Sequence, residues 1–358
     1  MSEHEFDGHV VGFIVDAQRE VAEEIGIYFA RSTSARTDRV RLVLTADAAR
    51  LHRQVEQVTS RPALGSASGH PQTRYRWWSP QPDVQLLIPD TGPAHLIEAD
   101  GSVGVTVTVW AAELATLART TIRIMRELLI RSVERDGGIL GHAAAVVIAG
   151  RAVVLASRPG SGKTTVALTL ADRHGAALCA ADRCLLLPDA SCGWRALAVP
   201  LAWRIAPGTV RALSALATAV THRFTGHRGP GLYEGKHEFV TGELATLLNV
   251  PTTPVAPGAV IVVLDHAPAQ LAGLVPVAPD GRDSAVLATM LRREDALFTT
   301  DWLGLPTLPA KTPTATEATG AALAATFSIY RGNWASHTEL ATLAELVVGL
   351  PELTSGRS

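Results

Sequence analysis

Residues 142–183 read HAAAVVIAGRAVVLASRPGSGKTTVALTLADRHGAALCAADR. Two apolar runs, 141–148 and 152–156, flank a short turn at 149–151 and predict a β-hairpin. The second run leads directly into a Gly-rich segment, which is followed by a helix-forming run that ends at Gly175. This order of strand, loop and helix predicts a nucleotide-binding α/β core.

The Gly-rich segment carries the most specific motif in the chain. Residues 157–164 read SRPGSGKT and meet the phosphate-loop pattern G-x-x-x-x-G-K-[ST], except that Ser157 replaces the first Gly. Glycines let backbone N–H groups turn inward around phosphate oxygens, and the following helix directs its positive end at the same anion. Lys163 is expected to reach the β- and γ-phosphates of ATP, and the Thr164 hydroxyl to hold Mg²⁺. The residues expected to contact the nucleotide are Arg158, Pro159, Gly160, Ser161, Gly162, Lys163, Thr164 and Thr165.

The segment 142–186 resembles the bacterial HPr kinase/phosphorylase family and its smaller relatives in peptide-modification gene clusters. In that family, a strand that begins His-Gly or His-Ala leads through a turn and a second strand into the phosphate loop, and a later strand ends Ala-Asp-Asp-Arg. Here His142 falls on the family histidine, Lys163 on the nucleotide position and Asp182 on the second aspartate. The specific part of the resemblance covers about 45 of the 358 residues.

The resemblance implies an ATP-dependent kinase that phosphorylates a Ser or Thr hydroxyl on a protein or peptide acceptor. The catalytic residues that it implies are Asp182, Lys163, Lys236 and His142, and the implied metal ligands are Thr164 and Asp182. Lys236 lies in the Gly- and His-rich segment 221–241, where relatives place a basic residue that can close on the phosphates. Relatives also assemble so that one subunit completes another's site, which implies a homo-oligomer.

One departure from the family bears directly on the chemistry. Ala181 stands where the family has the first of two aspartates, the pair that supplies the general base and a metal ligand. Asp182 alone would then bind Mg²⁺ and orient the acceptor, because phosphoryl transfer depends mainly on positioning and charge neutralisation. Asp265, which ends the apolar run 260–265, is the alternative metal carboxylate, and either aspartate could be an ordinary strand-end residue.

Three other functions stay open on the sequence. The loss at Ala181 favours an ATP-binding regulatory or scaffold protein that transfers no phosphate. A small-molecule kinase on the same scaffold has an acceptor pocket that the sequence does not reveal. A mechanical ATPase would need a stronger acidic pair than Asp265 and His266. The H-R-D and D-F-G motifs of protein kinases are absent from the sequence, so a kinase here would be of the phosphate-loop kind.

The whole chain is expected to be an α/β protein whose HPr kinase-like nucleotide-binding domain has a mixed β core. The expected parts are a smaller α+β domain at 1–110, a connecting amphipathic helix at 111–137 and the kinase-like domain at 138–358. The strands expected in the first domain are 10–15, 40–44, 83–89 and 103–109, with a loop at 60–82. In the second domain we expect strands at 177–187 and 259–264, a mobile loop at 221–241, and helices at 284–294, 316–327 and 337–349.

Composition and charge limit the partners. A net charge of −2, from 32 basic and 34 acidic residues, provides no positive field for nucleic acid. The N-terminal residues are acidic where a signal peptide would be basic, and no apolar run approaches the roughly 20 residues of a membrane span. The sequence therefore predicts a cytoplasmic protein with no nucleic-acid or membrane partner, and its 3 cysteines are expected to be reduced thiols.

Overall fold

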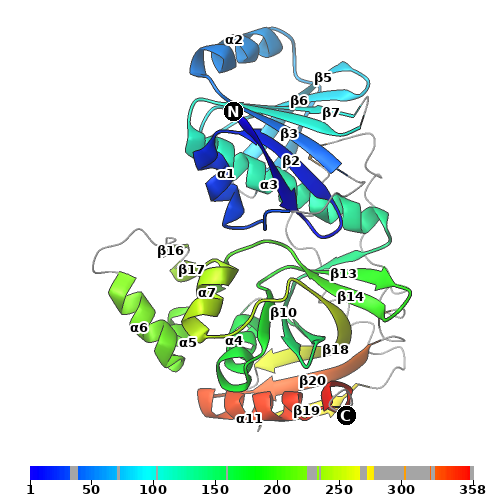
Figure 1. The fold of residues 1–358 in the computed structure, drawn as a ribbon, viewed down its shortest axis with the longest axis vertical. Coiled ribbons are helices and arrows are strands. Elements are labelled where there is room, and N and C mark those ends of the chain that lie inside the picture. The colour runs from blue at the N-terminus through cyan, green and yellow to red at the C-terminus, as the bar shows by residue number, and fades with distance from the viewer. Residues whose placement is uncertain are drawn as a thin grey trace. The chain divides into compact units, whose positions relative to one another are not determined.

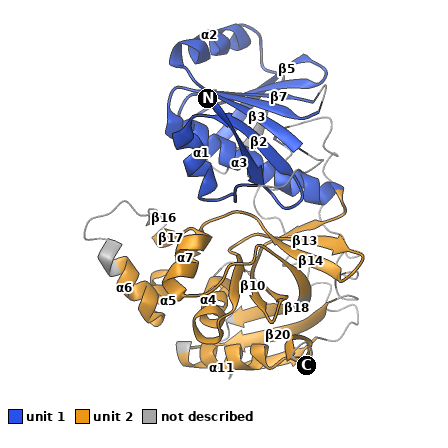
Figure 2. Ribbon diagram, in the orientation of Figure 1, with its two compact units in different colours: residues 1–135, 293–313 blue, residues 136–292, 314–358 orange. Residues whose placement is uncertain are grey.

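The structure is a computed structural model of a mixed α/β protein (Figure 1). It describes residues 1–32, 39–70, 73–101, 104–158, 160–223, 232–233, 235–266, 272–277, 302–303, 323 and 327–354. The chain divides into two compact units (Figure 2). The N-terminal unit comprises residues 1–135 and 293–313, and the C-terminal unit comprises residues 136–292 and 314–358.

The N-terminal unit contains a mixed sheet, which has eight strands within the described residues, in the order β1-β2-β3-β8-β7-β6-β5-β4. The strands are β1 (Ser2–Asp7), β2 (Gly12–Ala17), β3 (Arg39–Ala46), β4 (Gly65–His70), β5 (Thr73–Gln81), β6 (Val84–Pro89), β7 (His95–Asp100) and β8 (Thr106–Ala111). Strand β3 pairs in parallel with β2 and β8, and the other neighbours are antiparallel. The four strands expected from the sequence in this region are confirmed with shifted ends.

Three helices pack on this sheet. They are α1 (Arg19–Gly26), α2 (Ala48–Thr59) and α3 (Leu114–Arg135). Helix α2 contacts β7 and β8, whereas α3 contacts α1, β3 and β8. The connecting helix expected at 111–137 is thus part of the N-terminal unit, because its apolar stripe, which includes Leu117, Met125 and Leu128, is buried within that unit.

The expected loop at 60–82 is wrong, because most of it forms the hairpin of β4 and β5. In β5 the exposed Arg74 and Arg76 alternate with the buried Tyr75, which is the pattern of a half-buried strand. The Gly content of β4 has a packing reason, since a Cβ on Gly65 would lie 2.5 Å from the indole nitrogen of Trp77. From composition alone, such a run of small residues predicts a loop.

A buried polar cluster lies in the N-terminal unit. The Tyr75 hydroxyl donates to His95 Nε2 at 2.9 Å, and His95 Nδ1 donates to the carbonyl oxygen of Pro93 at 2.8 Å. Arg123 Nη1 donates to the same hydroxyl oxygen at 3.2 Å. The ring of Trp302, from the second segment of this unit, stacks on Tyr75 with centroids 5.3 Å apart. The stacking contact holds Trp302 against Tyr75 of the N-terminal sheet.

The cluster predicts a pH-dependent stability. Burial lowers the pKa of His95 from 6.5 to about 4, because the neutral ring is favoured there. Below pH 6.5 the unfolded chain takes up a proton that the folded chain does not, so the free energy of unfolding falls as the pH decreases toward 4. We expect His95 to contribute a loss of about 2 kcal/mol between pH 7 and pH 5.

Denaturant unfolding of the full chain at the two pH values checks this expectation. In the His95→Gln variant the pH-dependent loss should be smaller by that amount, whatever the variant's stability at pH 7. Equal losses in the variant and the wild type would contradict the assignment of the proton to His95.

The C-terminal unit is built on a second mixed sheet. Its described strands run in the order β12-β10-β11-β18-β14-β13-β9, with β20 on β18 and β19 on β20. They are β9 (Ile139–Gly141), β10 (Ala143–Ile148), β11 (Arg151–Ala156), β12 (Ala177–Ala180), β13 (Cys184–Asp189), β14 (Gly193–Ala198), β18 (Val255–His266), β19 (Gly273–Pro276) and β20 (Ser328–Trp334). The predicted hairpin is confirmed as β10 and β11, and its turn places Ala149 and Gly150 at positive φ.

Helices and a small sheet surround this core. The helices are α4 (Lys163–His174), α5 (Pro207–Ala212), α6 (Ser214–Arg223), α7 (Thr241–Leu248), α11 (His337–Val348) and α12 (Pro351–Thr354). A three-stranded sheet joins β15 (Trp203–Ile205), β17 (Lys236–Phe239) and β16 (Leu232–Tyr233) in that order. Helix α4 ends at Gly175, which has a φ of 65°, as the sequence predicts. None of the described helices combines the length and the apolar composition that crossing a membrane requires.

Several expected elements of this unit are corrected. The single strand expected at 177–187 is divided into β12 and β13, because β12 pairs with β10 whereas β13 pairs with β9. The segment 221–241, expected to be a mobile loop, contains β16 and β17. The helix expected at 284–294 and most of that expected at 316–327 lie outside the described residues, whereas the helix at 337–349 is confirmed as α11.

Candidate functional site

The register of the C-terminal sheet brings the ends of several strands to one edge. Strand β11 is parallel to β18, with Ala156 opposite Val263, so the loop that follows β11 begins beside the end of β18. Strand β10 is antiparallel to β11, with Ala143 opposite Ala156, so His142 lies at the same edge. The sequence-predicted loop therefore shares this edge with the predicted histidine.

Strand β12 brings the predicted aspartate to the same place. It is antiparallel to β10, with Ala180 opposite Ala145, and it ends at Ala180. Asp182 follows directly, in the short crossing between β12 and β13. Loop 157–162 is therefore flanked by Asp182 on the β12 side and by Asp265 on the β18 side.

Loop 157–162 has the backbone that its glycines predict. Gly160 and Gly162 have φ values of 85° and 88°, in the left-handed region that favours glycine. Ser157, which replaces the first Gly of the motif, is not among the residues with positive φ, so a side chain is tolerated there. Its hydroxyl donates to the carbonyl oxygen of Arg158 at 3.1 Å.

Lys163 begins helix α4 and is buried. Its side chain is 7% exposed, and its Nζ donates to the carbonyl oxygen of Ser157 at 3.1 Å. This bond joins the first residue of the loop to the first residue of the helix. An ammonium group at a helix N-terminus is unfavourable by itself, because both carry positive charge, so this arrangement favours an anionic partner.

Asp182 forms the acidic centre of the site. Its carboxylate accepts hydrogen bonds from Arg183 Nη1 at 2.6 Å and from His142 Nε2 at 3.1 Å, and the side chain stays 45% exposed. Burial by itself raises the pKa of Asp182, but the His142 hydrogen bond and the positive charges of Arg183 and Lys163 lower it well below its usual range. Asp182 is therefore ionised at neutral pH, the form that binds a cation.

The two threonines of the motif differ in their surroundings. Thr164 is half-buried in the first turn of α4. Thr165 is buried, and its hydroxyl shares a hydrogen bond with the Thr209 hydroxyl at 2.8 Å, which joins α4 to α5. Because the Thr165 hydroxyl is engaged, we expect Thr165 to contact the nucleotide through its main-chain N–H. Pro159 lies outside the described residues.

Lys236 is not placed as expected. It lies exposed on β17, where its backbone pairs with Tyr233, and not in a mobile loop. Strand β17 belongs to the small sheet with β15 and β16, and not to the larger sheet whose strand β11 leads into loop 157–162. A strand position is possible here because the residues 237–239 that follow Lys236 pair with β15.

Asp265 lies at the same edge of the sheet as loop 157–162, but its side chain is on the face opposite to α4. In β18, Val262 and Leu264 belong to the apolar cluster that includes residues of α4, whereas Val263 packs against the opposite cluster. Successive side chains of a strand alternate between faces, so Asp265 shares the face of Val263. Asp182 is therefore the better placed carboxylate for a cation bound near Lys163.

Sequence analysis missed Trp334, the last residue of β20. A Cβ on Gly162 would lie only 2.3 Å from the Trp334 ring, so the indole lies directly against the loop. No local pattern could have revealed this contact, because β20 reaches the loop only through its parallel pairing with β18.

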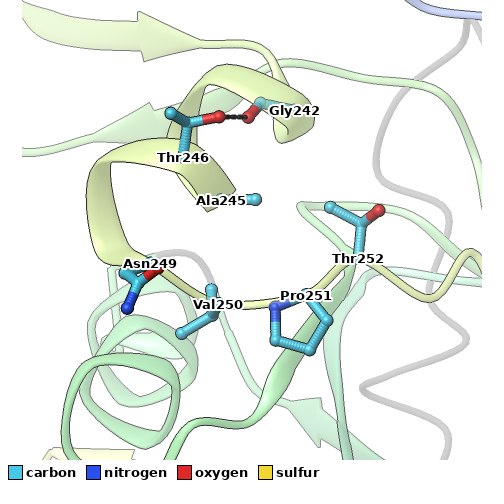
Figure 3. A pocket seen from close by; sticks show the side chains of 7 residues that line it. All are labelled: Gly242, Ala245, Thr246, Asn249, Val250, Pro251 and Thr252. Carbon is cyan, nitrogen blue, oxygen red and sulfur yellow. Dashed lines mark hydrogen bonds between the residues drawn. The ribbon is translucent and has the colours of Figure 1, made fainter.

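An open pocket of about 580 Å³ lies between one side of α7 and residues 249–252 (Figure 3). Its lining residues are Gly242, Ala245, Thr246, Asn249, Val250, Pro251 and Thr252. None of them is charged, and the Thr246 hydroxyl donates to the carbonyl oxygen of Gly242 at 2.9 Å. Because the lining offers no charge to a phosphate, we do not assign the nucleotide to this pocket.

The residues at the sheet edge fit ATP with Mg²⁺. Mg²⁺ prefers oxygen ligands and commonly takes one or two from protein, with phosphates and water completing its shell. Thr164 and Asp182 supply a hydroxyl and an ionised carboxylate. No group of three or more His, Cys, Asp or Glu residues that could hold a metal occurs among the described residues, so a site made of protein ligands alone is not found there.

A scan against models of known protein families finds no match to the chain, and a search of curated proteins finds none either. The resemblance to the HPr kinase/phosphorylase family therefore depends on the motif residues of 142–186 alone. It stays a prediction, and the function has to be argued from the site.

Proposed function

We propose that the protein is an ATP-dependent kinase that transfers the γ-phosphate to a Ser or Thr hydroxyl of a protein or peptide. The observation that carries the proposal is the meeting of loop 157–162, Lys163 and Asp182 at one sheet edge. The first two offer main-chain N–H groups and a positive charge to phosphate. The third offers a negative charge to a cation.

Each residue has a role in this proposal. Lys163 and the main-chain N–H groups of 160–165 bind the β- and γ-phosphates. Thr164 and Asp182 would hold Mg²⁺, which supplies charge neutralisation when bound. The exposed part of the Asp182 carboxylate also accepts a hydrogen bond from the acceptor hydroxyl and so orients it. His142 holds the carboxylate in place through its hydrogen bond.

One observation favours a second candidate, an ATP-binding regulatory protein that transfers no phosphate. Ala181 is 4% exposed and belongs to the apolar core, so the position of the first family aspartate provides no polar group. Both Asp182 oxygens already accept hydrogen bonds, from His142 and Arg183. Such an Asp182 could serve to support the site rather than to act on an acceptor.

Incubation with γ-labelled ATP separates these functions. The reaction contains Mg²⁺, the full-length protein and the proteins encoded beside it as candidate acceptors. A labelled Ser or Thr supports the proposal, and a labelled small molecule points to a small-molecule kinase. Binding of ATP without transfer to any acceptor supports the regulatory protein. Absence of ATP binding contradicts both.

A further inference from the structure

The two glycines of loop 157–162 differ in what surrounds them. Apart from its two chain neighbours, no described residue has an atom within 4 Å of the position that a Cβ on Gly160 would take. A Cβ on Gly162 would meet three ring atoms of Trp334, at 2.3, 3.1 and 3.3 Å. Gly160 therefore has free space around its Cα, whereas Gly162, which precedes α4, is in contact with the Trp334 ring.

Trp334 is fixed both by the packing of its ring and by the residues that follow it in the chain. Its ring is 8% exposed and belongs to the same core cluster as Val166 of α4 and Leu264 of β18. On the C-terminal side, Ser336 caps α11 by accepting from Glu339 N at 3.3 Å, and Glu339 Oε2 accepts from Ala335 N at 2.7 Å. The pair is similar to a capping box, except that Glu339 accepts from the N–H of the residue before the cap, and it fixes the junction between β20 and α11.

We propose that Trp334 is a positioning residue for the nucleotide site. Its indole limits the movement of Gly162, and therefore of the N–H groups that begin α4 and face the phosphates. A glycine at positive φ has several accessible conformations, so a loop of glycines needs an external wall to stay in one of them. This inference rests on the proposed binding of ATP.

The contact between Trp334 and Gly162 also links β20 and α11, near the C-terminus, to the proposed nucleotide site. Strand β20 pairs in parallel with β18 up to Trp334, and α11, which follows it, packs against α4. Residues 328–348 thus support α4 from a distant part of the sequence, with Trp334 against Gly162 at its start and Glu345 near His174 at its end. Loss of the indole is expected to loosen the loop without removing any group that touches phosphate.

Titration calorimetry with Mg–ATP tests the proposal on four full-length proteins: wild type, Trp334→Ala, Trp334→Phe and Trp194→Ala. Trp194 is the matched control, because it is 9% exposed in the same unit and lies on β14 next to residues that pair with the start of β18. We expect Trp334→Ala to raise the Kd roughly tenfold, because small misplacements of binding groups are costly. Trp334→Phe should restore most of the affinity, and Trp194→Ala should leave it unchanged.

Equal affinities in wild type and Trp334→Ala would overturn the proposal, and so would an equal loss in Trp194→Ala, which would indicate general destabilisation. Amide hydrogen exchange without nucleotide provides a second readout. Exchange at 160–164 should be at least tenfold faster in Trp334→Ala, or in Trp334→Leu, which also lacks the ring, if the alanine variant does not fold, and it should be unchanged in Trp194→Ala. A wild type that binds no ATP contradicts the proposed function, and in that case unchanged exchange would separately overturn the role of Trp334.

Discussion

Replacement of Lys163 by Met lowers the affinity for Mg–ATP by roughly 100-fold or more, because it deletes a charge-assisted contact to phosphate. The fold should be retained, since Met keeps the buried aliphatic length of the Lys163 side chain. Titration calorimetry measures the affinity, and circular dichroism checks the fold.

The matched control is Arg173→Met, which deletes an exposed positive charge from the last turn of the same helix. It should bind Mg–ATP like the wild type. If Lys163→Met also binds normally, the assignment of 157–164 as a phosphate loop is wrong. If both variants lose affinity equally, the effect is one of overall charge and not of the site.

The second large effect is expected at Asp182. The Asp182→Asn variant keeps the size of the side chain and one of its two acceptor oxygens, but it removes the charge that would bind Mg²⁺ and orient the acceptor. We expect phosphoryl transfer to slow on the order of 10²- to 10⁴-fold. The affinity for ATP should change much less, because Lys163 and the main-chain N–H groups remain. Single-turnover transfer from labelled ATP measures the rate.

Asp265→Asn is the comparison, and it should be the milder change because Asp265 shares the face of Val263, away from α4. A larger loss at Asp265 would show that the metal carboxylate lies on β18 and that the family alignment at Ala181 and Asp182 is misleading. If neither substitution alters transfer in an active wild type, then neither aspartate holds the metal.

The local elements of the site could be predicted because their signals are local. Gly160 and Gly162 adopt positive φ, and Gly175 ends α4 in the same region, as residues without a Cβ readily do. The hairpin of β10 and β11 follows from two apolar runs and a turn that contains Gly150. In the N-terminal unit, β1, β7, α1 and α2 were not expected. The two helices do carry apolar residues at helical spacing, Val21 with Ile25 in α1 and Leu51 with Val58 in α2, so their signal was present in the sequence and was missed.

The amino-acid sequence by itself determined where the chain turns, where α4 begins and ends, and which residues could bind phosphate. Only the tertiary structure decided the rest. It divided 177–187 into two strands at Asp182, since β12 and β13 pair with different partners. It placed Asp265 on the opposite face and set Trp334 against Gly162. Turns and caps depend on a few neighbouring residues, whereas strand partners and faces depend on pairings between distant segments, which no short window of sequence contains.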